Sequence, residues 1–309
     1  MKTVFMGTPD YAVKTLEKLI KAGHSVEAVF AQPDKPVGRK HILTPPPVKV
    51  CAEKNNIPVF QPDSLKGDEA KEILEKIAPD VIVVVAYGKL LPEYILNIPK
   101  FGCVNGHASL LPKYRGASPI QWSIVCGEKQ TGVTTMFMDK GMDTGDILET
   151  VTVDIGAEET AQELFERLSE ISADLMVSTL EKLEKGEITP KSQDESKASY
   201  APIIKKEMAF LDFKRNAVEL HNAIRGYYSW PCAYFYIDGK RIKVISARVG
   251  SKTNEKPATV IANDDELIIA CGENTSLKLV TIQPEGSKAM SAKQFLCGNK
   301  LPKGYVIGE

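Results

Sequence analysis

The sequence lacks any paired cysteine motif, and it has no long apolar run near its start. Its six cysteines are scattered without CxxC spacing and lie mostly within apolar runs, so neither a zinc site nor a disulfide framework is indicated. We interpret the cysteines as buried, reduced, small apolar residues. Residues 1–10 contain only a short apolar run, which is unlike a signal peptide or a membrane helix. A cytoplasmic protein without membrane attachment is therefore expected.

A glycine-rich phosphate loop is also missing. Residues 7–10 form the turn at which a dinucleotide-binding fold would place that loop, but Gly7 is their only glycine and Pro9 has no backbone donor. NAD binding is accordingly disfavoured. The sequence has no heptad pattern or obvious pairing strip either, which favours a monomer.

What the sequence does contain is an alternation of strand-like and helix-like segments. Residues 3–6 and 26–31 are apolar runs, and residues 12–22 between them have helical periodicity. Residues 81–86 are almost entirely β-branched, which is typical of a parallel strand buried on both faces. The pattern predicts an α/β domain with a Rossmann-like, mostly parallel sheet, which we assign to residues 1–186.

A second domain is predicted after a polar segment. Residues 187–201 are mostly polar and have no period, which is typical of an exposed linker, and we assign residues 187–204 to that linker. Beyond them, strand-like runs at 234–237 and 241–244 flank an Asp-Gly pair, a strong hairpin signal. With the short apolar runs that follow, residues 205–309 are expected to form a small, OB-like β-barrel. This last third carries an excess of Lys and Arg, although the whole chain has a net charge of −1.

Asn105, Gly106 and His107 form the most informative stretch of the chain. If they end a strand, the alternation of side chains directs Asn105 and His107 to one face and Gly106 to the other. An amide and an imidazole on one face can both donate to a developing oxyanion. Asp143, in the turn-prone Asp-Thr-Gly-Asp stretch further on, can keep that imidazole charged and relay a proton through water. This set suits transfer of a formyl or other acyl group to an amine.

Each of these residues also has a plain structural interpretation. His107 can be a strand-end histidine satisfied by the backbone, and Asn105 can simply cap a turn. Asp143 and Asp146 can be turn residues around Gly145, or a carboxylate pair for a divalent cation. The combination favours catalysis, and we expect no metal.

Two groups of basic residues suit contact with phosphate. Arg39 and Lys40 lie in a loop bounded by prolines. The last third of the chain holds the second group, Lys205, Lys206, Arg241 and Lys243. Basic residues on a small barrel often bind nucleic acid. Both groups are equally compatible with a solvated surface.

The chain closely resembles the methionyl-tRNA formyltransferase family along nearly its whole length. The matching stretches are residues 7–12, 32–39, 105–116, 142–146 and 279–298. The resemblance implies transfer of formyl from 10-formyltetrahydrofolate to the α-amino group of methionine on initiator tRNA. It also implies that Asn105, His107 and Asp143 occupy the catalytic positions of the family.

The resemblance further implies which residues contact the two substrates. Those implied for the folate are Ser109, Leu110, Leu111 and Pro112, together with Tyr87, Gly88 and Leu90 of a loop that helps form the pterin pocket. Arg39 would reach the acceptor end of the tRNA, because the family uses that loop to contact the tRNA.

One position departs from the family pattern. The family usually carries a larger apolar residue between the asparagine and the histidine, whereas this chain has Gly106. Glycine loosens a strand, so the sequence predicts that Gly106→Val preserves or improves turnover.

Three rival functions use some of the same features. A glycinamide ribonucleotide transformylase shares the three polar residues and the folate but is a single α/β domain, so the basic extension past Ala201 argues against it. A sugar-nucleotide formyltransferase is a further relative, which the loop and carboxyl-terminal matches weaken. A non-catalytic RNA-binding protein is the third, and it would have no need of Asn105, His107 and Asp143.

Overall fold

The computed structural model describes residues 1–309 except 39–40, 263–264, 300 and 309. The chain divides into two compact units. The first unit comprises Met1–Pro119, Thr131–Val153 and Phe165–Ala201, and the second comprises Ile120–Gln130, Asp154–Leu164 and Pro202–Glu309.

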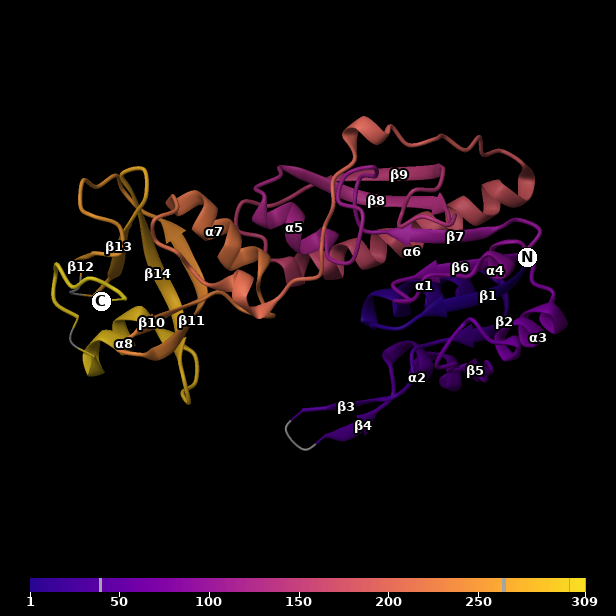
Figure 1. Ribbon diagram of the computed structural model, residues 1–309, viewed down its shortest axis with the longest axis horizontal. Coiled ribbons are helices and arrows are strands. Elements are labelled where there is room, and N and C mark those ends of the chain that lie inside the picture. Colours follow the sequence, from indigo (N-terminus) through magenta and orange to yellow (C-terminus); the bar gives the residue numbers. More distant parts are fainter. Residues whose placement is uncertain (39–40, 263–264, 300, 309) are drawn as a thin grey trace. The chain divides into compact units, whose positions relative to one another are not determined.

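The main sheet has seven strands in the order β5-β2-β1-β6-β7-β8-β9 (Figure 1). They are β1 (Lys2–Gly7), β2 (Ser25–Phe30), β5 (Val59–Phe60), β6 (Val81–Val85), β7 (Cys103–His107), β8 (Gln130–Phe137) and β9 (Ile147–Asp154). Neighbouring strands from β5 to β7 are parallel, and β8 runs antiparallel to β7. The predicted mostly parallel, Rossmann-like sheet is confirmed.

Helices cover both faces of this sheet. They are α1 (Asp10–Lys21), α2 (Pro47–Lys54), α3 (Asp68–Ile77), α4 (Glu93–Leu96) and α6 (Ala161–Lys185). Buried residues of α3 and α4 pack with alternate residues of β1, β2 and β6, such as Met6 and Val84. On the other face α1 meets α6, because the ring of Tyr11 packs edge-on against that of Phe165. The sheet is therefore buried on both sides, as its apolar strands require.

The strand order of this sheet reverses next to β1. From β1 the chain proceeds to β2 and β5 on one side, whereas β6 and β7 lie on the other. In open α/β sheets, ligands bind outside the carboxyl ends of the strands where the strand order reverses in this way. Gly7, Val85 and His107 end β1, β6 and β7 at that edge.

The polar segment expected as an exposed linker contacts the first unit along much of its length. Lys191 forms a β-bridge with Ile147, and Tyr200 forms one with Arg115. Ala201 donates its backbone N–H to the carbonyl of Arg115 at 2.7 Å. The segment is held by hydrogen bonds from its backbone and from individual polar side chains. Because it does not bury an apolar face, its sequence shows no apolar period.

The second unit is built around an antiparallel sheet in the order β10-β11-β14-β13-β12, with β15 paired to β14. Its strands are β10 (Tyr234–Ile237), β11 (Lys240–Val249), β12 (Val260–Ala262), β13 (Leu267–Cys271), β14 (Thr275–Pro284) and β15 (Met290–Ser291). Asp238 and Gly239 have φ of 48° and 73°, the left-handed conformation that a tight hairpin between β10 and β11 requires. The predicted hairpin and the small antiparallel β domain are confirmed.

Short helices complete the second unit. They are α5 (Pro119–Val125), α7 (Ala217–Gly226) and α8 (Ala292–Gly298). Apolar residues of α7 and α8, such as Leu220 and Phe295, share one core with the strands. Across the described residues, no helix is both long and apolar enough to traverse a lipid bilayer.

The cysteines differ in part from the sequence interpretation. All six are free, but Cys126 and Cys297 are exposed, while the other four are buried. Cys297 lies in α8, and Cys126 directly follows α5. The expectation of uniform burial was wrong for these two, which lie at or just after the end of a short helix.

Candidate active site

Asn105 and His107 lie on one face of β7, at the carboxyl edge of the sheet. Their side chains are largely buried, with 8% and 7% of each residue exposed. Gly106 faces the opposite way, because a Cβ atom built on it would approach Ser172 and Met176 of α6. The alternation predicted from the sequence is therefore present in the structure.

Both ring nitrogens of His107 face oxygen atoms. The Nε2 atom lies 3.0 Å from the carbonyl oxygen of Tyr114. A carbonyl can only accept, so Nε2 carries a proton. The Nδ1 atom lies 3.8 Å from Oδ2 of Asp143, a spacing that exceeds that of a direct hydrogen bond.

The carboxylate of Asp143 is fixed from two directions. Its Oδ2 atom accepts the backbone N–H of Gly116 at 2.8 Å. Its own backbone is left-handed, with φ of 55°, and its carbonyl oxygen accepts a hydrogen bond from Nε2 of Gln193 at 2.9 Å. The structure thus brings Asn105 and His107 of β7 and Asp143 of a distant turn to the same end of the sheet.

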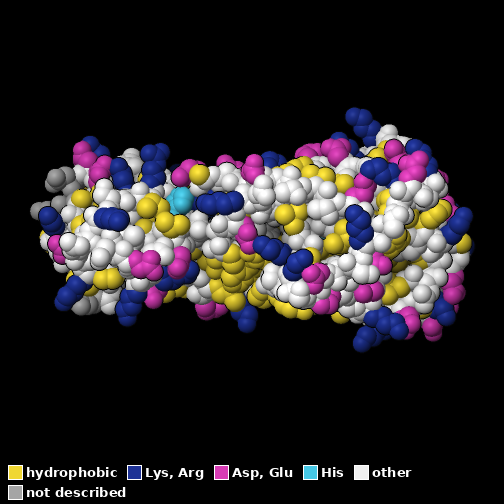
Figure 2. Space-filling view, turned by 90° about the horizontal axis from the view of Figure 1, so that it is seen from above, with side chains coloured by type: hydrophobic (Ala, Val, Ile, Leu, Met, Phe, Trp, Pro, Cys, Tyr) yellow, Lys and Arg dark blue, Asp and Glu magenta, His cyan; other side chains and the backbone are white. Residues whose placement is uncertain are grey.

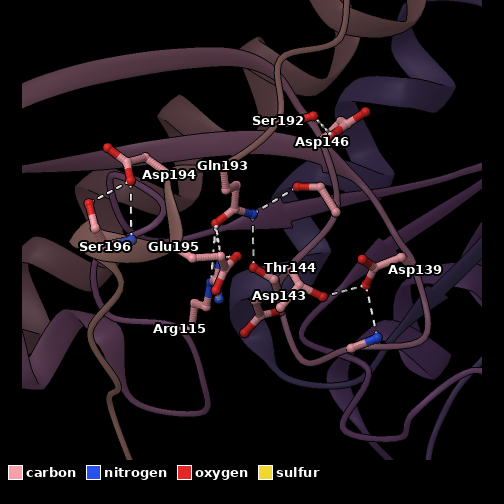
Figure 3. A network of polar contacts seen from close by, with 12 residues as sticks. Arg115, Asp139, Asp143, Thr144, Asp146, Ser192, Gln193, Asp194, Glu195 and Ser196 are labelled. Atoms are coloured by element: carbon pink, nitrogen blue, oxygen red, sulfur yellow. Dashed lines mark hydrogen bonds and ion pairs between the residues drawn. The ribbon is translucent and has the colours of Figure 1, made fainter.

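The turn that holds Asp143 is ordered by local contacts (Figure 3). The Oδ1 atom of Asp139 accepts from the N–H of Gly141 at 2.9 Å and from the hydroxyl of Thr144 at 2.6 Å. A Cβ atom on Gly145 would lie 1.9 Å from the carbonyl oxygen of Phe137, so only glycine fits there. The turn is therefore pressed against the end of β8.

Asp146 plays a different part from Asp143. Its carboxylate accepts the hydroxyl of Ser192 at 2.9 Å, whereas that of Asp143 accepts from Gly116. The two carboxylates of the Asp-Thr-Gly-Asp stretch thus have separate partners, and Figure 3 shows them directed apart.

The side-chain amide of Asn105 is available to a ligand. Among the described residues, none forms a hydrogen bond with it, although its neighbours on β6 and β8, Val84 and Met136, hold its backbone in register. A nearly buried amide without a protein partner can donate to a substrate oxygen at no cost in broken protein contacts.

The four residues after Ala108 form a tight segment beside β7. Thr134 of β8 fixes it, because its hydroxyl donates to the carbonyl of Ser109 at 2.7 Å and accepts the N–H of Leu111 at 3.2 Å. The hydroxyl of Ser109 is buried and donates to the carbonyl of Lys113 at 2.6 Å. Leu110 packs over Gly132, and Pro112 is half-buried. Ser109 therefore shapes this segment and does not present its hydroxyl to a ligand.

The loop after β6 combines an exposed apolar tip with a buried anchor. Leu90 is 67% exposed, whereas the ring of Tyr87 is buried. The carbonyl of Tyr87 accepts from the hydroxyl of Thr8 and from the amide of Gln32, both at 3.1 Å. Gly88 is exposed and has φ of 83°, which explains the glycine. The loop is thus tied to the ends of β1 and β2, and Leu90 extends from it into solvent.

The basic loop predicted to project from the first domain contains a small hairpin. Its strands are β3 (Lys35–Val37) and β4 (Ile42–Thr44), paired in antiparallel fashion (Figure 1). Three of its apolar side chains are exposed: Val37, Ile42 and Leu43. Arg39 and Lys40 lie outside the described residues.

The basic residues predicted to contact nucleic acid in the last third lie beside aromatic rings. Arg241 and Lys243 of β11 pair with Tyr236 and Tyr234 of β10. The guanidinium of Arg241 lies 5.9 Å from the ring centre of Tyr234, and the rings of Tyr234 and Tyr236 are 5.7 Å apart. Phe210, 48% exposed, lies 5.8 Å from Tyr234. We call these five residues the ring surface.

Lys205 and Lys206 precede the ring surface in the chain. Both are exposed, and Lys206 begins a 3₁₀ turn (Lys206–Ala209) shortly before Phe210. On the face drawn in Figure 2, Lys and Arg side chains are interspersed with Asp and Glu. On this face, a case for phosphate binding depends on particular clusters and not on a broad field of one sign.

Three residues near Asp143 were missed by the sequence analysis. They are Arg115, Gln193 and Glu195, which form a connected polar network with the Asp143 turn (Figure 3). Arg115 is 1% exposed. In the sequence it belongs to the stretch 105–116 that resembles the family, but nothing there distinguishes it from its neighbours. Gln193 and Glu195 lie in the aperiodic segment interpreted as a linker, and no local pattern distinguishes them.

Comparison with known proteins identifies the family. Residues 1–180 match the family described as "Formyl transferase", and residues 203–300 match "Formyl transferase, C-terminal domain". A methionyl-tRNA formyltransferase from Lachnospira eligens is 48% identical over 316 residues and is covered completely, as is this chain. One from Caldanaerobacter subterraneus subsp. tengcongensis is 46% identical, over 99% of this chain and 100% of the relative. The chain belongs to the methionyl-tRNA formyltransferase family.

Solved structures agree with this family membership at the level of the fold. A methionyl-tRNA formyltransferase from Clostridium thermocellum superposes with a TM-score of 0.55 at 21% identity, covering 82% of this chain and 95% of that one. A sugar 3N-formyl transferase, WlaRD, crystallised with dTDP and 5-N-formyl-THF, gives a TM-score of 0.69 at 19% identity over 93% of this chain and 99% of that one. The family is enzymatic, and this chain has both of its domains.

Proposed function

We propose that this formyltransferase moves the formyl group of 10-formyltetrahydrofolate to the α-amino group of methionine on initiator tRNA. The observation that carries the proposal is the convergence of Asn105, His107 and Asp143 at the carboxyl edge of the sheet. Identity of 46–48% along the whole length of named relatives supports the choice of acceptor.

The chemistry requires one bond to form and one to break. The neutral amine attacks the formyl carbon, and the carbonyl electrons move onto oxygen to give a tetrahedral species. Its collapse breaks the bond from carbon to N10 of the folate and restores the formyl group on the amino nitrogen. The amine loses one proton and N10 gains one, so the reaction needs an oxyanion donor and a proton carrier.

Asn105 is assigned to the oxyanion. Its amide has no partner among the described residues, and a neutral N–H donor stabilises the developing charge without first having to leave another group. Removing one such donor typically lowers turnover by about 10²–10³-fold.

His107 and Asp143 are assigned to the proton. The Nε2 proton of His107 is engaged by the carbonyl of Tyr114 at 3.0 Å, so Nδ1, facing Asp143, is the ring atom that exchanges a proton. The carboxylate of Asp143 stabilises the imidazolium that results. A water molecule or the attacking amine can bridge the 3.8 Å between them.

The folate is proposed to bind where two segments flank the end of β7. Leu90 and Gly88 are exposed on one segment, and Leu110, Leu111 and Pro112 form the other. Apolar side chains and open backbone suit the faces and edges of a pterin. Ser109 and Tyr87, first expected to touch the folate, are assigned a supporting role because their side chains are buried.

The tRNA is proposed to contact the basic hairpin and the second unit. Arg39 and Lys40 of the hairpin would neutralise phosphates near the acceptor end. On the second unit, Lys205, Lys206, Arg241 and Lys243 would do the same, and the exposed rings beside them offer a stacking surface.

We retain the assignment of catalysis to the domain at 1–186 and of tRNA binding to 205–309. Residues 187–204 were proposed as a linker, but the contacts of residues 191–201 support counting that part with the catalytic domain. We also propose that the protein acts as a monomer in the cytoplasm, where both of its substrates are found.

The test is a formyl-transfer assay with 10-formyltetrahydrofolate and three acceptors in parallel: charged initiator tRNA, glycinamide ribonucleotide and a nucleotide-linked amino sugar. We expect formylmethionyl-tRNA to form rapidly and the other two products to be negligible. Efficient use of either small acceptor would reassign the substrate, and retention of the tRNA without formylation would indicate a binding protein.

Paired variants locate the chemistry. Asn105→Ala should lower turnover by about 10²–10³-fold, while Asn97→Ala, the same change at an exposed residue directly after α4, should leave it unchanged. Equal activity of the two variants would remove Asn105 from the mechanism.

A further inference from the structure

A buried guanidinium lies beneath the turn that carries Asp143. Arg115 is 1% exposed, and its side chain donates in two directions. Its Nη1 and Nη2 atoms lie 2.9 and 2.6 Å from the two carboxylate oxygens of Glu195. Its Nε and Nη2 atoms lie 3.1 and 2.8 Å from Oε1 of Gln193. Such a forked, charge-assisted arrangement fixes the position of both partners.

Arg115 also determines which way the amide of Gln193 points. A guanidinium only donates, so the oxygen of Gln193 must face it and the NH₂ group must face away. That NH₂ group donates to the carbonyl of Asp143 at 2.9 Å and to that of Gly145 at 2.8 Å. Figure 3 shows the amide of Gln193 between the guanidinium and the turn. Every polar atom of the Gln193 amide thus has a partner.

These two hydrogen bonds act on a residue in a restricted conformation. Asp143 has a left-handed backbone with φ of 55°, a conformation that is less favourable than the right-handed one for residues with a Cβ atom, although Asp tolerates it better than most. Rotation of the backbone at this point would turn the carboxylate away from Nδ1 of His107. Gln193 holds the carbonyl of Asp143 itself and the carbonyl two residues later, so it clamps the turn on both sides.

The same segment supports the opposite side of the site. Ser199 accepts the backbone N–H of Tyr114 on its hydroxyl at 2.9 Å and that of Arg115 on its carbonyl at 2.8 Å. The carbonyl of Tyr114 is the acceptor for Nε2 of His107, and the next residue but one, Gly116, donates to Asp143. Residues 193–201 therefore hold the backbone on both sides of the contact between His107 and Asp143.

We propose that Gln193, oriented by Arg115, is a positioning residue that holds the carboxylate of Asp143 in line with His107 during formyl transfer. The inference rests on the proposed function, because it assigns a purpose to the contact between Asp143 and His107. Gln193 reaches only the backbone of the turn, so it acts through Asp143 and not on the substrates.

The first test is Gln193→Glu in the full-length enzyme. The variant keeps the size of the side chain and an oxygen for Arg115, but it replaces the NH₂ donor by an oxygen that repels the two carbonyls. We expect kcat to fall about 10- to 100-fold while KM for the folate and for the tRNA changes less than about twofold, because the interaction is needed only for the reacting geometry. A fall in affinity with kcat unchanged would overturn the proposal.

Ser192→Ala is the matched control. Ser192 is the preceding residue and also links this segment to the turn, but through the carboxylate of Asp146. Its loss should leave kcat within about twofold of the unmodified enzyme. If Ser192→Ala and Gln193→Glu reduced kcat equally, the effect would be general loosening of the segment and the positioning role would be wrong.

Glu195→Gln provides a variant that is safe for folding, since the side chain of Glu195 is 69% exposed. It weakens the hold on Arg115 without touching Gln193, and we expect a smaller fall in kcat, about two- to fivefold, again without a change in KM. An unchanged kcat in this variant would remove Arg115 and Glu195 from the proposal.

A double-mutant cycle then distinguishes positioning from other effects. In the Asp143→Asn background, Gln193→Glu should change the remaining single-turnover rate by less than about threefold, because the residue that it positions has already lost its charge. A full 10- to 100-fold effect in that background would show that Gln193 acts independently of Asp143. If the unmodified enzyme failed to formylate charged initiator tRNA, the proposed function would be at fault and not the role of Gln193.

Discussion

Gly106 of β7 lies directly against Ser172 of α6. A Cβ atom on Gly106 would lie 3.0 Å from Oγ of Ser172, 3.4 Å from Cε of Met176 and 3.6 Å from Cγ2 of Val85. Ser172 is fully buried, so its side chain has little room to withdraw. The space beside Gly106, on the face of β7 opposite the catalytic residues, is therefore already filled. The expectation that Gly106→Val preserves turnover does not fit this packing.

We predict that Gly106→Val destabilises the protein by about 1–3 kcal/mol, the usual range for an overpacked core, and lowers kcat by shifting Asn105 and His107. Adding Ser172→Gly should recover much of both losses, although a glycine within a helix itself costs about 1 kcal/mol. Urea unfolding and formylation rates of the single and double variants check this. Unchanged stability of Gly106→Val would contradict the crowding seen here.

Arg39→Ala should weaken use of the tRNA while leaving folate binding intact. One lost phosphate contact reduces the slope of log affinity against log salt by about 1, so KM for the tRNA should be measured over a series of salt concentrations. Lys76→Ala, on an exposed residue in the last turn of α3, is the control. An equal rise in KM for the folate and for the tRNA would contradict this separation of tasks.

The second unit should lose stability in mild acid because of His221. Burial lowers the pKa of this imidazole below its ordinary value of 6.5; Glu158, 3.2 Å from Nε2, opposes the shift, and Arg225 adds to it. The unfolded chain therefore binds the proton more readily, so the contribution is present above pH 6.5 and is lost as the pH falls through the folded pKa.

His221→Gln tests this expectation by urea unfolding at pH 7.5 and at lower pH. The variant should lose less stability than the unmodified protein over the same interval. His24, whose pKa burial also lowers, is present in both proteins and cancels in the comparison. A parallel fall in the two proteins would show that His221 does not contribute.

The thiols should divide into two classes toward a disulfide reagent such as DTNB. Cys126 and Cys297 are exposed and should react rapidly in the folded protein. Burial raises the pKa of Cys103 and of Cys271 to about 12, so these thiols should react only on unfolding, since the thiolate is the reactive form. Rapid reaction of more than two thiols in the native protein would contradict the structure.

The sequence was most informative where a local period reflects burial. The β-branched run at 81–86 predicted a strand with no exposed face, and β6 is fully buried. The alternation around Gly106 predicted which residues share a face, and the Asp-Gly pair at 238–239 predicted the hairpin turn. Each of these features depends only on residues close in the chain.

The parts that the sequence could not predict depend on contacts between distant segments. Nothing near Gly106 indicates that α6 fills the space behind it, because Ser172 is 66 residues away in the chain. The segment at 187–204 resembles a linker because polar hydrogen bonds carry no period, yet Gln193 holds the turn of Asp143. The residue types of His107 and Asp143 suggested one site, and the family resemblance implied the same, but only the structure gives the distance between them.

The location of Gln193 and Ser199 late in the first unit has a consequence for synthesis of the protein. The residues of β7 and the turn at 143–146 leave the ribosome well before residues 193–201, which complete their support. A nascent chain that ends near residue 186 therefore contains the three polar groups but not the contacts that hold two of them. The order of translation itself delays maturation of the site until residues 193–201 have been made.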